Sequence, residues 1–147
     1  MYLARASAAR GSLIAFTRCG LIEYQESGAG VPLLMIHGRG GGDDQGMAFA
    51  GGLARQGIRV VAMSRIGYLR TPMPRDSSPA TQAEAHVCLL DALGISQAAV
   101  LGGSAGAPSA MQLANRHPGR LRALILLVPL AWKPVTTTKA STPPLAP

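Results

Sequence analysis

Hydrophobic residues in this chain gather in short continuous runs separated by longer mixed stretches. Four runs are almost wholly apolar: residues 31–36, 58–63, 98–101 and 121–128. Such runs are typical of strands buried on both faces of a sheet. Residues 21–25 predict a further short strand, which ends at a glycine-containing turn.

The stretches between these runs have helical patterns, predicted over residues 43–55, 81–93 and 107–116. Asp43 or Asp44 can cap the first helix, and Gly57 ends it. A capping-box pattern, Thr81 to Glu84, opens the second. Because parallel strands need such crossovers, the order predicts an α/β fold, with a mostly parallel sheet and helices on both faces.

The domain organisation follows from length and composition. A chain of 147 residues fits one domain. Residues 1–19 are interpreted as a lead-in that can include a first strand, and 20–132 as the folded domain. Residues 133–147, rich in Pro and Thr, are predicted to be a disordered tail.

Charge and composition narrow the function classes. The net charge is +7, but 12 of the 14 basic residues are Arg, scattered without a run and with few aromatic residues between them. We therefore expect no nucleic-acid partner. No apolar run approaches the roughly 18 residues that a membrane span needs. The two cysteines, Cys19 and Cys88, are expected to be reduced, which suits the cytoplasm. The acid-free, Arg-containing N-terminus leaves organelle import as the alternative.

Two glycine-rich loops carry the candidate chemistry. Gly102-Gly103-Ser104-Ala105-Gly106 follows a predicted strand and precedes a predicted helix, the setting that a nucleophile elbow (G-x-S-x-G) requires. His37-Gly38-Arg39-Gly40-Gly41-Gly42 ends an earlier buried strand, and its low side-chain bulk lets backbone N–H groups approach a substrate oxygen. The spacing therefore predicts a serine nucleophile beside an oxyanion hole.

With these motifs the sequence resembles the α/β-hydrolase superfamily, in its bacterial-type serine hydrolases with an HGxGGG loop. The matching text includes Val31 to Gly38, Ser64 to Tyr68, Leu89 to Ile95, Arg116 to Pro118 and Leu124 to Pro129. The resemblance implies hydrolysis of a carboxylic ester or similar acyl bond, without a cofactor or metal. It implies Ser104 as nucleophile, oxyanion donors from Ala105 and Arg39 (Gly40 is the close alternative), and a supporting loop of His37, Gly38 and Gly40.

The chain departs from the family pattern in three places. Gly103 and Ser64 stand where many relatives carry His and Asp. More seriously, no Asp or Glu follows Ser104, and the one later histidine is His117, at the far end of a helix. No triad acid or histidine is therefore found, and the resemblance covers the first half of the fold. The alternative function is a truncated, catalytically incomplete product, and the last strand is expected to be an exposed edge that self-associates.

The remaining candidates have structural explanations. His37 is expected to brace its own loop by hydrogen bonds. His86 is expected to lie within a helix with its ring nitrogens hydrogen-bonded, and His117 is expected to help end its helix. Cys88 is expected to pack within its helix. The segment from Arg65 to Pro72 fits a substrate entrance and a solvated loop equally well.

Overall fold

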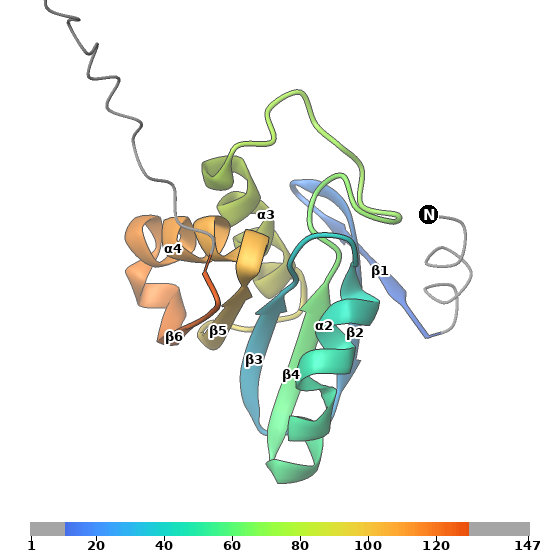
Figure 1. Cartoon of the computed structure of the whole chain (residues 1–147), viewed down its shortest axis with the longest axis vertical. Helices are drawn as coiled ribbons and strands as arrows, with labels where there is room; N and C mark the ends of the chain where they lie inside the picture. Colours follow the sequence, from blue (N-terminus) through green and yellow to red (C-terminus); the bar gives the residue numbers. More distant parts are fainter. Residues whose placement is uncertain (1–10, 130–147) are drawn as a thin grey trace, which may run out of the picture.

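The computed structural model describes residues 11–129. Its centre is a six-stranded sheet in the order β1-β2-β4-β3-β5-β6 (Figure 1). The strands span β1 Leu13–Thr17, β2 Gly20–Ser27, β3 Val31–Ile36, β4 Ile58–Met63, β5 Ala98–Gly103 and β6 Leu121–Leu127. β3 pairs in parallel with β4 and β5, and β5 with β6, whereas β1 and β2 are antiparallel additions. The mostly parallel sheet of the predicted α/β fold is confirmed.

Helices cover both faces of the sheet. Helix α2 (Asp43–Ala50) and the 3₁₀ turn η1 (Gly51–Gln56) lie on one face, and α3 (Pro79–Ala92) and α4 (Ala107–Arg116) lie on the other (Figure 1). Two short 3₁₀ turns, η2 (Ser104–Gly106) and η3 (Pro118–Arg120), flank α4. Alternate side chains of the central strands pack into two hydrophobic cores on opposite faces of the sheet. Leu34 and Ile36 belong to the larger core, with α3 and α4. Leu33 and Met35 belong to the smaller core, beside α2.

Two predicted helix boundaries are wrong. The helix expected over 43–55 ends at Ala50 and continues as a 3₁₀ turn, where Gly51 and Gly52 weaken α-helical order. Its N-cap is Gly42 rather than an aspartate. Helix α3 begins at Pro79, before the expected capping box, because the Ser78 side chain accepts a hydrogen bond from the Thr81 N–H.

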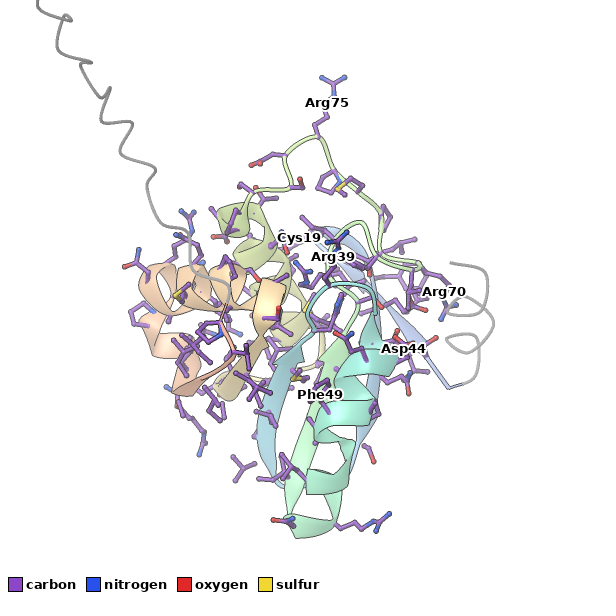
Figure 2. All side chains as sticks on the ribbon, viewed as in Figure 1. Cys19, Arg39, Asp44, Phe49, Arg70 and Arg75 are labelled. Atoms are coloured by element: carbon purple, nitrogen blue, oxygen red, sulfur yellow. A yellow bond between two sulfur atoms is a disulfide. The ribbon has the colours of Figure 1, made fainter. Side chains whose placement is uncertain are left out.

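The expectation of reduced cysteines is also contradicted. Cys19, on the turn between β1 and β2, forms a disulfide with Cys88 of α3, and their Cα atoms are 6.0 Å apart. Figure 2 shows Cys19 beside α3. The two positions are 69 residues apart, so only the tertiary fold brings them together. The bridge ties the N-terminal hairpin to the helix layer.

Strand β6 forms one edge of the described sheet. The strongly apolar residues Leu124, Ile125 and Leu127 are 38%, 46% and 41% exposed. Only β5 pairs with this strand, which leaves its outer backbone groups unpaired among residues 11–129. The expected Pro/Thr tail, 133–147, lies outside the described residues.

Candidate active site

The elbow is a strained turn between β5 and α4. Ser104 has φ +45°, in the left-handed region that non-glycine residues rarely adopt, and its side chain is exposed. A Cβ added at Gly102 would lie 2.7 Å from the Cβ of Ala110, and one at Gly106 would lie 2.6 Å from the His37 carbonyl oxygen. Both glycines are therefore required by backbone approach, which is the physical content of the G-x-S-x-G spacing.

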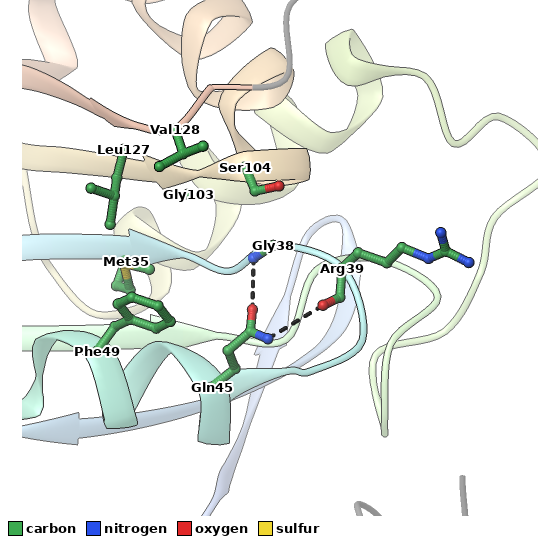
Figure 3. Close-up of a pocket in the computed structure, with 9 residues that line it drawn as sticks. All are labelled: Met35, Gly38, Arg39, Gln45, Phe49, Gly103, Ser104, Leu127 and Val128. Carbon is green, nitrogen blue, oxygen red and sulfur yellow. Dashed lines mark hydrogen bonds between the residues drawn. The ribbon is translucent and has the colours of Figure 1, made fainter.

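The loop after β3 lies directly against the serine. A Cβ added at Gly38 would come within 3.3 Å of the Ser104 Cβ, so the two loops meet at the carboxyl ends of β3 and β5 (Figure 3). A cavity of about 410 Å³ opens at this junction. Its walls are mostly apolar, and it is lined by Met35, Gly38, Arg39, Gln45, Phe49, Gly103, Ser104, Leu127 and Val128. The arrangement can hold a small, largely apolar molecule beside an exposed hydroxyl.

His37 is fully buried beneath the loop. Its Nε2 accepts a hydrogen bond from the Arg65 backbone N–H at 2.9 Å, and its Nδ1 lies 2.7 Å from the Gly38 carbonyl oxygen. Because Nε2 is an acceptor, the proton sits on Nδ1 and donates to Gly38. Burial, with the Arg65 charge adding to it, lowers the pKa of His37 to about 4. Both ring nitrogens are thus occupied away from Ser104.

The other two histidines are also engaged elsewhere. His86 is buried, with Nε2 2.9 Å from the Ser109 hydroxyl and Nδ1 2.9 Å from the Met63 sulfur. Burial lowers the pKa of His86 to about 3. His117 lies at the far end of α4, with its Nε2 2.9 Å from the Glu84 carboxylate. These are all three histidines of the chain. None of the three is hydrogen-bonded to Ser104.

Arg65 braces the same loop with a buried guanidinium. It donates to the Gly38 carbonyl at 3.2 Å and to the Gln82 side chain at 3.0 Å, and it stacks over the ring of Tyr68. Burial lowers its pKa. No residue of the segment 65–72 lines the Ser104 cavity. Arg65 itself is neither an entrance residue nor a solvated one.

Two carboxylates share a buried network behind the loop. The Ser64 hydroxyl lies 2.8 Å from Asp43 Oδ1 and 3.1 Å from Glu23 Oε2. Burial raises the pKa of Asp43, and hydrogen bonds from Gln25 and Ser64 oppose it. Burial also raises the pKa of Glu23, but hydrogen bonds from Arg70 and its other partners outweigh this and hold it below the usual value. The Ser64 hydroxyl thus links two acids.

One lining residue was not singled out from the sequence. Gln45 accepts a hydrogen bond from the Gly38 N–H at 2.9 Å and donates to the Arg39 carbonyl at 3.3 Å. Its sequence signal is its place in the first turn of the helix that follows the glycine loop, since helical side chains point back toward the N-terminus.

Residues 11–129 contain no cluster of three or more His, Cys, Asp and Glu residues suited to a metal ion, and no helix among them is long and apolar enough to cross a membrane.

Comparisons with known proteins identify the family and the fold of this chain. The family model described as the alpha/beta hydrolase fold matches residues 31–145. The 2-hydroxymuconate semialdehyde hydrolase of Pseudomonas putida is 39% identical over 105 residues, which are 69% of this chain and 37% of that protein. YcgS of Bacillus subtilis, an uncharacterized hydrolase, is 35% identical over 107 residues, 73% of this chain and 37% of that protein.

A solved structure shows the same relation. An alpha/beta hydrolase fold protein from Nakamurella multipartita superposes with a TM-score of 0.79 at 40% identity, over 82% of this chain and 42% of that one. The chain therefore spans less than half the length of the relatives it matches. In sequence and in fold, this chain belongs to the alpha/beta hydrolase fold family.

Proposed function

We propose that this chain carries the nucleophile and oxyanion half of a serine hydrolase site that acts on a carboxylic ester or similar acyl bond. The observation that carries the proposal is the left-handed backbone of Ser104, which presents the hydroxyl to a cavity faced by the Gly38 loop. Strain of this kind persists where the surrounding structure enforces it, and it is common at active sites.

In the proposed reaction the Ser104 oxygen attacks the substrate carbonyl carbon, the carbonyl π bond opens to an oxyanion, and the serine proton passes to a base, which added imidazole can supply. Collapse of this intermediate breaks the bond between the acyl carbon and the leaving alcohol, which takes up a proton, and the acyl group left on Ser104 is then hydrolysed by water. The developing negative charge on the carbonyl oxygen is stabilised by the backbone N–H groups of Ala105 and Arg39. The mostly apolar wall, which includes Met35 and Phe49, accommodates the acyl part of the substrate. The names of two relatives, a 2-hydroxymuconate semialdehyde hydrolase and an uncharacterized hydrolase, support a hydrolytic reaction.

A second candidate, a chain that does not turn over substrate by itself, rests on the histidines. Each has its ring engaged by other groups, and no acid follows Asp91 in the sequence. A serine without a base remains protonated and attacks slowly, and general-base help contributes typically 10²–10⁴-fold. We therefore expect the chain to hydrolyse p-nitrophenyl esters no faster than its Ser104→Ala variant.

Added imidazole tests separately whether Ser104 is the nucleophile and whether the chain lacks a general base. Imidazole can replace a missing base at an open site, so it should increase labelling of Ser104 by a fluorophosphonate, read as the mass of the modified peptide. Without imidazole we expect weak labelling or none. Labelling should be absent at this position in Ser104→Ala.

Two results would contradict the proposal. If imidazole leaves Ser104 unlabelled, the nucleophile assignment is wrong. If the chain alone gives robust ester turnover that Ser104→Ala abolishes, a base is present and the incomplete-site candidate is wrong; a further loss in His37→Ala or His86→Ala would then identify it.

A further inference from the structure

The Gln45 side chain joins two successive residues of the loop that faces Ser104 (Figure 3). Its Oε1 accepts from the Gly38 N–H at 2.9 Å, and its Nε2 donates to the Arg39 carbonyl at 3.3 Å. Since a backbone N–H only donates and a carbonyl only accepts, these partners fix which amide atom is oxygen and which is nitrogen. One side chain therefore sets the orientation of the peptide groups before and after the Gly38–Arg39 peptide.

The Gly38–Arg39 peptide itself is held by hydrogen bonds from the buried side of the loop. Its carbonyl accepts from the Nδ1 of His37 at 2.7 Å and from the Arg65 guanidinium at 3.2 Å. In a trans peptide the N–H points opposite to the C=O, so the Arg39 N–H is directed away from the buried His37 ring and toward the exposed side of the loop. Within residues 11–129 this N–H has no hydrogen-bond acceptor.

The same hydrogen bonds also orient the N–H of Gly40, the alternative oxyanion donor. The Arg39 carbonyl points at Gln45, which lines the cavity, so the Gly40 N–H of that peptide points away from Gln45. Gly41 shows how closely the loop follows the side chain, because a Cβ there would lie 2.4 Å from the Gln45 Cβ.

The helix that presents Gln45 is firmly held. Its neighbour Asp43 is hydrogen-bonded by Gln25 and Ser64, and a Cβ at Gly46 would lie 2.9 Å from the Ala62 Cβ on β4. A side chain on a fixed helix positions a loop more accurately than the loop's own glycines can.

We propose that Gln45 is a positioning residue, which holds the Gly38–Arg39 backbone so that the Arg39 N–H meets the carbonyl oxygen of an acyl group attacked by Ser104. The inference rests on the proposed function, because the N–H acts only if Ser104 is the nucleophile. Gln45 works through the loop and touches no reacting atom in this account.

The test is imidazole-assisted labelling of Ser104 by a fluorophosphonate, measured as the maximal rate and the half-saturating reagent concentration. Gln45→Met removes both hydrogen bonds at similar volume, and we expect the maximal rate to fall about 10-fold or more, below the loss for a complete oxyanion donor. The half-saturating concentration should change little, because the apolar wall is intact. Gln112→Met, on α4 outside the cavity, is the matched control and should label like the wild type.

A second variant tests the amide's dual role. The carboxylate of Gln45→Glu accepts from Gly38 but cannot donate to Arg39, and it places negative charge near the developing oxyanion. We expect it to label more slowly than Gln45→Met, whereas a purely space-filling role would make the isosteric Glu the milder change. Thermal melts of both variants establish that they fold.

The outcomes are distinguishable. If the wild type shows no imidazole-dependent labelling, the proposed function and this inference both fail. If the wild type is labelled and a folded Gln45→Met is labelled at the same rate, only the assignment of Gln45 is wrong. A higher half-saturating reagent concentration with an unchanged maximal rate would likewise overturn the assignment of Gln45, because that result is expected of a residue that binds the reagent.

Discussion

Two buried, uncharged histidines make the stability of this fold depend on pH. The pKa of His37 is lowered to about 4 and that of His86 to about 3, chiefly by burial, against 6.5 for the unfolded chain. As the pH falls below 6.5, the unfolded chain takes up these protons before the folded one does. The stabilising contribution is therefore complete above about pH 6.5 and is lost progressively toward pH 4 and 3.

The magnitude follows from the two pKa values. At about pH 5 the unfolded chain has bound nearly one proton at each position and the folded chain almost none, which costs about 2 kcal/mol per histidine. The pair together costs about 4 kcal/mol, a large part of the 5–15 kcal/mol typical of a domain. The lowered pKa of Glu23 acts in the same direction only near and below pH 4.5, and the raised pKa of Asp43 acts in the opposite direction.

Urea unfolding followed by circular dichroism, at a series of pH values from about 8 to 5, measures this loss. His86→Gln should reduce the dependence of unfolding free energy on pH by about half, whatever its effect on absolute stability. Gln112→Met on α4, which removes no titratable group, is the control. Equal stability at both ends of the range, or an unchanged slope in His86→Gln, would refute the reasoning.

Three further predictions concern the elbow, the disulfide and the sheet edge. Gly106→Ala should lower the unfolding free energy by about 1–3 kcal/mol, because the added Cβ would lie 2.6 Å from backbone oxygens. Gly52→Ala is the control, because a Cβ there meets open space and should change the unfolding free energy far less. Urea unfolding measures both variants. Reduction of the Cys19–Cys88 bridge should cost about 2–4 kcal/mol and lower the melting temperature, with Cys19→Ser showing no response to reductant. Ile125→Lys should reduce self-association measured by light scattering, and a monomeric wild type would contradict the edge-strand argument.

The order of elements was predictable because it depends on local signals. The apolar runs at 31–36 and 58–63 coincide with β3 and β4, since strands covered on both faces carry no polar alternation. The end of α3 near Gly94 is a similar local signal. The strand order β4-β3-β5 was not predicted, because pairing depends on contacts between residues far apart in the chain.

The predictions that were wrong concern features for which the sequence offers several equivalent local signals, or which depend on tertiary contacts. Ser78 and Thr81 are both good caps, and the position of Pro79 at the first helical residue selects Ser78. Cys88 has the sequence pattern of a packed helix residue, and nothing nearby indicates a partner 69 positions earlier. A disulfide between distant positions is visible only once the hairpin and α3 are placed together.

The candidate site shows the same division between local and tertiary information. The elbow was predictable because Gly102, Ser104 and Gly106 encode their own backbone requirements within one turn. The hydrogen bonds that hold the His37–Gly42 loop were not predictable, because the amide of Gln45 meets its partners only when α2 packs against the end of β3. A glycine-rich loop permits close approach but fixes no orientation, so its geometry must come from side chains outside the motif. In this chain those side chains are Gln45 on one side of the loop and His37 with Arg65 on the other.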